Sequence, residues 1–123
     1  MKNEADPIML EIMSNALQSV VDEMTATLIR TAYSPNIKDR IDCSCALLTS
    51  GGEVVAQTEF GTPFHLATMP AAAATILRKY PLEDLSSGDS VAMNVPYPTG
   101  PGHLSDVTLL RPFFSEERRS AFW

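Results

Sequence analysis

A stretch rich in proline and glycine at residues 97–102 constrains the fold of this chain most strongly. Proline lacks a backbone N–H and glycine loses the most conformational freedom on ordering, so neither a regular helix nor a central strand can run through this stretch. It is followed by His103 and Asp106 and then by an apolar run at residues 107–110. The sequence therefore predicts a loop that presents a histidine and an aspartate at the start of a strand.

The spacing of His103 and Asp106 decides whether their side chains can act together. Residues three apart point to opposite faces of a straight strand, whereas in a single turn they lie on the same side. In a turn over residues 103–106, the imidazole and the carboxylate can supply two ligands to Zn²⁺, Mn²⁺ or Fe²⁺, and a catalytic site needs at least one more ligand and an open position. The alternative is that Asp106 caps a local turn and His103 is a solvated loop residue.

Length and charge limit the classes of function. A chain of 123 residues fits a single domain, residues 1–123, that can bury about two-thirds of its unfolded surface. The formal charge of −6 disfavours nucleic acid and anionic membranes as partners, because both require clustered Lys and Arg. No stretch approaches the about 18 apolar residues of a membrane span, and the N-terminus lacks the apolar segment of a signal peptide. We therefore expect a cytoplasmic protein.

Two helices are predicted from their start signals and periodicity. Asp6-Pro7 favours a helix start, and apolar residues then recur at helical spacing to about Thr31. This stripe comprises Met9, Ile12, Met13, Ala16, Leu17, Val20, Val21, Met24 and Leu28. We interpret it as core, with the alternative that it packs on a neighbouring chain. After a loop at residues 61–66, a second helix is predicted to open at residues 68–70 and to end near Tyr80.

Short apolar runs predict the strands. Residues 43–48 and 53–58 flank a Thr-Ser-Gly-Gly segment, the composition expected of a tight hairpin turn. Residues 90–94 and 107–114 are predicted as two further strands, with Pro112 marking an edge or an end. We therefore expect an α+β fold in which two main helices pack on a small, mostly antiparallel sheet.

The two cysteines are Cys43 and Cys45, with one residue between them. On a strand they point to the same face with Cα atoms about 6.5 Å apart, which is too far for an easy disulfide. We interpret both as small buried hydrophobic residues.

Four segments of the chain form a combined pattern. They are Asp6-Pro7-Ile8 leading into RTAYSPNIKDR at 30–40, DCSCAL at 42–47 with Val55-Ala56-Gln57, HLATMP at 65–70 and GHLSDVTL at 102–109. Taken jointly, they resemble the N-terminal part of the hydantoinase B/5-oxoprolinase family, which includes N-methylhydantoinase, 5-oxoprolinase and acetone carboxylase. The resemblance covers nearly the whole chain but only the first part of a B-type unit, which is several times longer. We therefore interpret the chain as an N-terminal fragment of such a unit.

The resemblance implies a chemistry and a set of site residues. In this family an A-type partner uses ATP to phosphorylate a carbonyl or enol-type oxygen, and the B-type unit completes hydrolysis or carboxylation beside a divalent metal. By this resemblance His103 and Asp106 fall on two metal-binding positions, the third ligand is a later histidine beyond Trp123, and the metal is Mn, Zn or Fe. His65 resembles a residue near the site, and is a candidate for substrate contact or proton transfer. The implied partner is an A-type subunit, in a homo- or hetero-oligomer, and this chain itself is not expected to bind ATP.

Departures from the family pattern leave alternatives open. Asn94-Val95-Pro96-Tyr97 replaces a common NDPY, so a carboxylate is lost, and residues 98–102 replace a glycine pair. The first hypothesis is a B-type component of an ATP-dependent cyclic-amide hydrolase acting on 5-oxoproline or a hydantoin, with acetone-type carboxylation as a variant. The second is a non-catalytic structural or assembly module. The third is a small-ligand binder that uses the loop around Tyr97.

Overall fold

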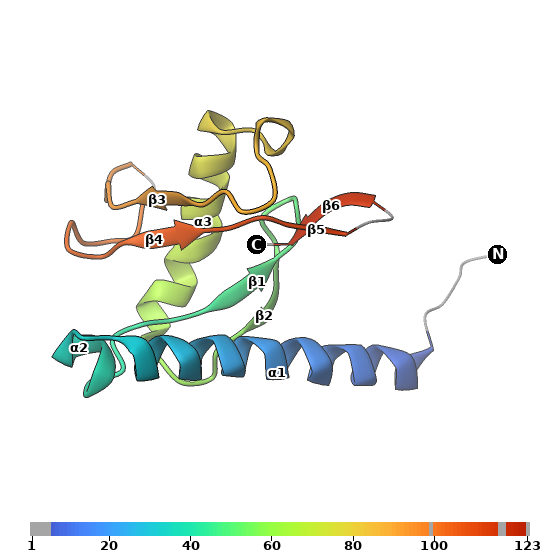
Figure 1. The fold of residues 1–123 in the computed structure, drawn as a ribbon, viewed down its shortest axis with the longest axis horizontal. Helices are drawn as coiled ribbons and strands as arrows, with labels where there is room; N and C mark the ends of the chain where they lie inside the picture. The colour runs from blue at the N-terminus through green and yellow to red at the C-terminus, as the bar shows by residue number, and fades with distance from the viewer. Residues whose placement is uncertain (1–5, 99, 116–117, 123) are drawn as a thin grey trace.

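The computed structural model describes residues 6–98, 100–115 and 118–122. Over these residues the fold is α+β, as predicted, with two long helices and three antiparallel strand pairs (Figure 1). The helices are α1 (Pro7–Thr31), the short α2 (Pro35–Lys38) and α3 (Pro63–Lys79), with a 3-10 turn η1 at Leu82–Asp84. The strands are β1 (Ala46–Leu48), β2 (Val54–Gln57), β3 (Val91–Met93), β4 (Thr108–Leu110), β5 (Phe113–Ser115) and β6 (Arg118–Phe122).

Helix α1 begins and ends where the sequence predicts. The Asp6 carboxylate accepts a hydrogen bond from the Ile8 backbone N–H at 3.0 Å, and Pro7 occupies the first helical position. The helix ends at Thr31, and Ala32 has an extended backbone. The start is stable because the aspartate satisfies one free N–H group and proline has none to satisfy.

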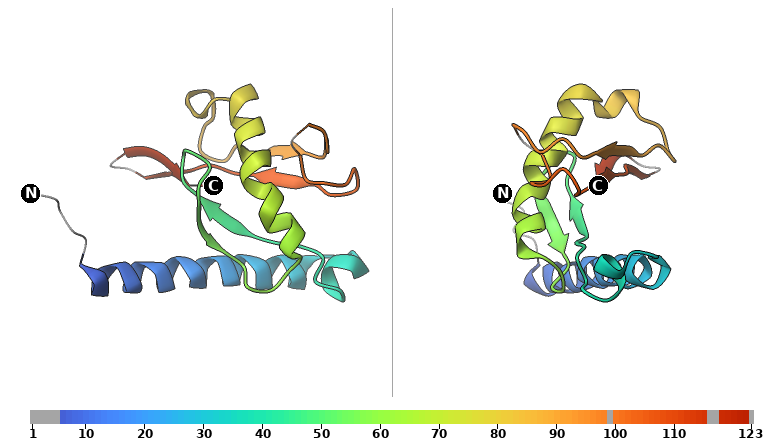
Figure 2. Two further views of the ribbon diagram at one scale, coloured as in Figure 1. Left: turned by 180° about the vertical axis from the view of Figure 1, so that it is seen from behind. Right: turned by 90° about the vertical axis from the view of Figure 1, so that its left-hand side faces the viewer.

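The middle of α1 contributes most of its contacts with the core. Val21 is fully buried and packs with Leu47 and Ala56 of the β1–β2 hairpin. The first turns of α1 extend beyond β1 and β2 (Figure 2), and the large apolar side chains of these turns are between 53% and 69% exposed. These side chains, which we name the α1 apolar segment, are Ile8, Met9, Leu10, Ile12 and Met13. The interpretation of the stripe as core is therefore right for Val21, against whose cluster Leu17 and Met24 pack partly buried. It is wrong for the exposed members of the stripe, which are Met9, Ile12, Met13, Ala16, Val20 and Leu28.

The adjacent valines of α1 provide a test of this division. Val21→Ala is expected to lower the free energy of unfolding by about 2 kcal/mol, because it deletes two fully buried methyl groups. Val20, which is 46% exposed, is the matched control. Val20→Ala is expected to be neutral or slightly stabilising, because alanine is the better helix former. Urea unfolding of both variants measures the difference, and equal losses would contradict the placement of Val21 in the core.

Helix α3 begins at Pro63, five residues before the predicted start. The prediction of a loop at residues 61–66 and a helix start at 68–70 is therefore wrong. Two prolines, Pro63 and Pro70, each offer a start signal, and the structure places Pro63 at the first helical position and Pro70 inside the helix. The consequence for the site is that His65 lies on the first turn of a helix, where its backbone is fixed, and not on irregular chain.

The predicted β1–β2 hairpin is confirmed, with Leu47 opposite Ala56. Strands β3 and β4 pair antiparallel, with Ala92 opposite Leu109. The predicted strand at 107–114 is interrupted before Pro112, and β5 pairs with β6 and not with β3. Within the described residues the strand pairs form separate two-stranded sheets instead of one sheet. Pro112 favours the break between β4 and β5, because proline cannot donate the N–H that would continue the ladder.

A second core cluster joins these pairs to α3. It consists of Leu48, Ala73, Ile76 and Leu110, all less than 6% exposed. Because this cluster fixes β4 against α3, it also fixes the loop that enters β4, which contains His103 and Asp106.

Among the described residues, no helix combines the length and hydropathy needed to cross a bilayer. Trp123 lies outside the described residues.

Candidate metal site

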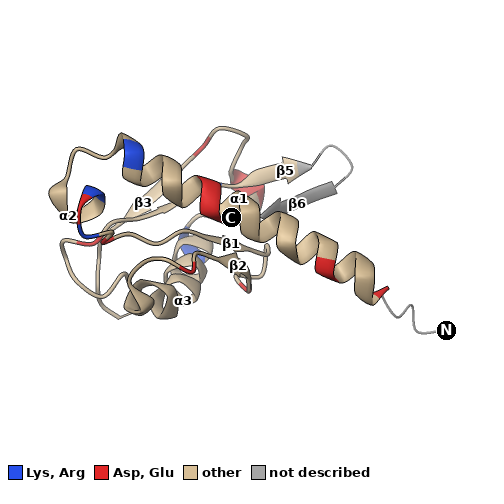
Figure 3. Cartoon of the chain, turned by 90° about the horizontal axis from the view of Figure 1, so that it is seen from below, with Lys and Arg blue, Asp and Glu red and all other residues tan. Residues whose placement is uncertain are grey.

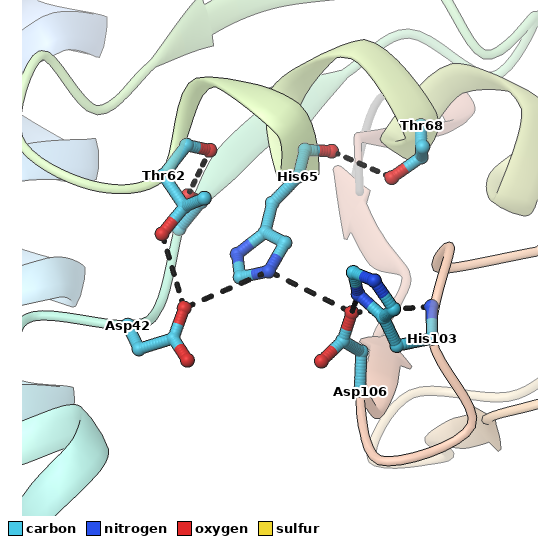
Figure 4. Close-up of polar contacts among 7 residues, drawn as sticks. Asp42, Thr62, His65, Thr68, His103 and Asp106 are labelled. Carbon is cyan, nitrogen blue, oxygen red and sulfur yellow. Dashed lines mark hydrogen bonds and ion pairs between the residues drawn. The ribbon is translucent and has the colours of Figure 1, made fainter.

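Residues 103–106 form the turn that the sequence predicts (Figure 4). The Asp106 backbone N–H donates to the His103 carbonyl at 3.1 Å, which closes the turn. The Asp106 carboxylate folds back and accepts a hydrogen bond from the His103 backbone N–H at 3.3 Å. The same carboxylate oxygen, Oδ2, lies 3.2 Å from His103 Nδ1. The imidazole and the carboxylate therefore converge on one side of the turn.

The separation of these two donor atoms fits a shared metal ion. Two donors bound at about 2.1 Å lie about 3.0 Å apart in octahedral and about 3.4 Å apart in tetrahedral geometry. The 3.2 Å between Nδ1 and Oδ2 falls between these values. The same distance also suits a hydrogen bond from Nδ1 to Asp106, which would leave Nε2 as the metal-binding nitrogen. In both arrangements His103 can be a ligand, and they differ in the role of Asp106.

His65 approaches the same carboxylate from α3. Its Nε2 lies 3.8 Å from Asp106 Oδ2 and 3.8 Å from Asp42 Oδ1. Both distances are too long for direct hydrogen bonds, so the imidazole lies between two carboxylates without being bonded to either. The His65 side chain is 19% exposed, whereas that of His103 is 73% exposed. The structure therefore brings together all three sequence-predicted site residues, with His65 the more enclosed histidine.

Asp42 is a member of this cluster that the sequence reasoning missed. The Thr62 hydroxyl, at the N-cap position of α3, donates to Asp42 Oδ1 at 3.1 Å and so holds the carboxylate toward His65 (Figure 4). The only signal for Asp42 in the sequence was its place at the start of the DCSCAL segment. We name Asp42, His65, His103 and Asp106 the site cluster.

The donor set within the described ranges is incomplete as a metal site. Among these residues, no group of three or more His, Cys, Asp or Glu side chains is arranged to hold a metal ion. His103 and Asp106 supply two donors of the types that Zn²⁺, Mn²⁺ and Fe²⁺ accept. The chemistry of this pair fits such an ion, and the assignment of His103 and Asp106 as ligands stays a prediction.

Cys43 and Cys45 are free thiols, and Cys43 is buried. Burial raises the pKa of the Cys43 thiol, and the neighbouring Cys45 and Asp42 raise that pKa further. A buried thiol with a raised pKa is a poor nucleophile and a poor metal ligand, because both roles require the thiolate. The interpretation of Cys43 as a small buried hydrophobic residue is confirmed, and Cys45 is only partly buried.

The raised pKa of Cys43 predicts a loss of stability at alkaline pH. The folded protein keeps the thiol proton at pH values where the unfolded chain has lost it. This contribution is fully present below the pKa of the unfolded thiol and is lost as the pH rises through the folded pKa. The free energy of unfolding should therefore fall more steeply above about pH 8.5 in the wild type than in Cys43→Ala. Urea unfolding at a series of pH values measures both free energies. If the wild type and Cys43→Ala lose stability in parallel as the pH rises, the prediction is refuted.

The fold and the site cluster define an α+β protein with a His-x-x-Asp turn beside a histidine and a further carboxylate. These are groups used in metal-assisted and acid–base chemistry. A family model described as hydantoinase B/oxoprolinase matches residues 6–123, and the chain belongs to this family.

Curated relatives match most of this chain. An uncharacterized protein, MJ0963, of Methanocaldococcus jannaschii is 42% identical over 89% of this chain and 19% of its own length. A 5-oxoprolinase of Dictyostelium discoideum is 38% identical over 90% of this chain and 8% of its own length. The B-type subunit of a putative D-/L-hydantoinase from a Pseudomonas species is 29% identical over 95% of this chain and 20% of its own length. The chain therefore spans a fifth or less of these relatives, and no solved structure matches it.

Proposed function

We propose that the chain is a B-type component of an ATP-dependent cyclic-amide hydrolase, in which His103 and Asp106 bind a divalent metal ion, Mn²⁺, Zn²⁺ or Fe²⁺. The observation that carries the proposal is the turn in which His103 Nδ1 and Asp106 Oδ2 lie 3.2 Å apart. The names of the relatives supply the substrate class, since one is a 5-oxoprolinase and another the B-type component of a putative D-/L-hydantoinase. The substrate would be an activated lactam such as 5-oxoproline, or a hydantoin.

The residues of the site cluster suit this chemistry. A bound divalent ion supplies Lewis acidity toward an amide or acyl-phosphate oxygen and a lower pKa for bound water. His103, exposed to solvent, can meet an incoming substrate, while Asp106 fixes the orientation of its ring. His65, 3.8 Å from each of two carboxylate oxygens, is placed to accept or release a proton. Thr62 holds Asp42 on the far side of His65.

The proposal includes an A-type partner that binds and uses ATP. The α1 apolar segment supports a partner, because contiguous exposed apolar side chains of this kind mark contact surfaces. Figure 3 shows acidic positions along α1 and basic positions at its C-terminal end and around α2. A homo- or hetero-oligomer in which this segment is covered is part of the proposal.

The experiment is a reconstitution of ring opening. The chain is combined with a hydantoinase A-type protein, ATP, Mn²⁺ and either 5-oxoproline or hydantoin, and ring opening is followed by product formation. We expect turnover that requires this chain, is abolished by EDTA and is lost in His103→Ala. Turnover that is equal with and without EDTA would contradict the metal role.

The same assay separates the second candidate function, a non-catalytic assembly module. That function is favoured by the incomplete donor set among the described residues. It predicts that the chain binds the A-type protein and that His103→Ala and Asp106→Ala leave both binding and turnover unchanged. Acetone-type carboxylation, the variant reaction, predicts ATP-dependent bicarbonate incorporation in place of ring opening.

A further inference from the structure

The ring of Phe64 lies against the backbone just before the His103–Asp106 turn. A Cβ atom placed on Gly102 would collide with the Phe64 ring atoms Cε1 and Cζ, and Gly102 has a φ of +102°. The same ring lies beside the His103 imidazole, with centroids 5.6 Å apart and planes at 42°. Phe64 therefore touches the chain at Gly102, directly before the turn, and at His103, the first residue of the turn.

Phe64 and the turn differ in how firmly their backbones are held. Phe64 is the second residue of α3, whose helical hydrogen bonds fix its position. Residues 103–106 belong to a loop between β3 and β4. This loop is held by the hydrogen bonds within the turn and by the Asn94 side chain, which donates to the Leu104 carbonyl at 3.2 Å. A rigid helix thus presents an aromatic ring to an irregular segment that needs support.

The arrangement also explains how His65 and Asp106 come together. Phe64 and His65 are consecutive on α3, with ring centroids 6.4 Å apart. In the arrangement in which the Phe64 ring packs against Gly102, His65 Nε2 lies 3.8 Å from Asp106 Oδ2. One contact of α3 therefore sets both the orientation of His103 and the approach of His65 to the turn.

From this geometry we infer that Phe64 is a positioning residue that holds the His103–Asp106 turn against α3. We also infer that position 102 is glycine because the Phe64 ring approaches its backbone. The inference rests on the proposed function, in which His103 and Asp106 bind metal. Phe64 itself touches no reacting atom. Its effect is transmitted through the orientation of the two ligands.

The test compares Phe64→Leu with Phe60→Leu. Phe64 is 47% exposed and Phe60 66% exposed, so neither substitution empties a core, and Phe60 lies outside the site cluster. Amide hydrogen exchange at His103 and Asp106, whose N–H groups close the turn, is expected to quicken about tenfold or more in Phe64→Leu alone. The Mn²⁺ or Zn²⁺ affinity of the chain is expected to fall about 10- to 100-fold in Phe64→Leu and to stay unchanged in Phe60→Leu.

A double-mutant cycle with Gly102→Ala tests the contact itself. The positive φ strains alanine at position 102 in either background, whereas the collision with the ring is present only when Phe64 is. Gly102→Ala should therefore speed exchange at His103 and Asp106 more in the wild type than in Phe64→Leu. Strictly additive effects would overturn the inference.

The outcomes distinguish this inference from the proposed function. Equal exchange rates in Phe64→Leu and Phe60→Leu would overturn the positioning role even if the wild type binds metal tightly. If exchange is faster in Phe64→Leu alone and the wild-type chain binds no metal, the positioning role of Phe64 is supported and the metal function is refuted.

Discussion

Asp106→Ala is expected to lower the affinity of the chain for Mn²⁺ or Zn²⁺ by more than about 100-fold, beyond the 10- to 100-fold cost of removing a group that only orients a ligand. The physical reason is that the carboxylate contributes an anionic donor and also holds His103 through its backbone N–H and its ring. His103→Ala should have an effect of similar size, because it removes the other donor. Isothermal titration calorimetry measures both.

The control is Asp84→Ala, which removes an exposed carboxylate from η1 and should leave metal affinity unchanged. The size of the loss decides between the two geometries of the site. A loss of only 10- to 100-fold in Asp106→Ala would mean that Asp106 orients His103 without binding the ion. Unchanged affinity in both site variants would contradict the proposed function.

Gly61→Ala is expected to lower the free energy of unfolding by about 2 to 4 kcal/mol, through backbone strain and overpacking together. Gly61 has a φ of +147°, and a Cβ there would lie 2.5 Å from the Cys43 carbonyl oxygen and 2.8 Å from Ser44 Oγ. The segment that carries Asp42 and Cys43, which precedes β1, would have to move away from the start of α3. Chemical unfolding measures the loss.

Gly88 supplies the matched control for this prediction. It has a φ of +98°, but a Cβ there would meet nothing within 4 Å. Gly88→Ala should therefore show strain alone, about 1 kcal/mol. If the two variants lose equal stability, the close approach between Gly61 and Cys43 does not contribute, and the support it gives to Asp42 is refuted.

Local signals in the sequence predicted much of the fold. Asp6-Pro7 fixes the start of α1 because a cap and a first-position proline act within one turn. The Thr-Ser-Gly-Gly segment predicts the β1–β2 hairpin, because a tight turn also depends only on consecutive residues. The start of α3 was misplaced because Pro63 and Pro70 carry equivalent local signals, and only tertiary packing decides which of them opens the helix. The burial of Val21 but not Val20 likewise depends on where the hairpin docks.

The site residues also fall into two groups, those that local sequence signals predict and those that depend on tertiary packing. The turn of His103 and Asp106 was predictable, since their spacing is local and the preceding prolines and glycines exclude regular structure. The approach of His65 to Asp106 joins residues that are far apart in the chain and depends on how α3 packs on β4. Asp42 and Phe64 act through contacts with Thr62 and Gly102, and these contacts between distant segments cannot be read from local spacing.

The most direct test of the account is the location of a bound paramagnetic ion. Substoichiometric Mn²⁺ added to the isotope-labelled chain broadens the NMR signals of the residues nearest to it. We predict that the signals of His103 and Asp106 disappear first and that those of His65 and Phe64 follow. The metal site at His103 and Asp106 would be contradicted if the signals of these two residues were unaffected and the broadening centred on another acidic segment, such as Glu83 and Asp84 of η1.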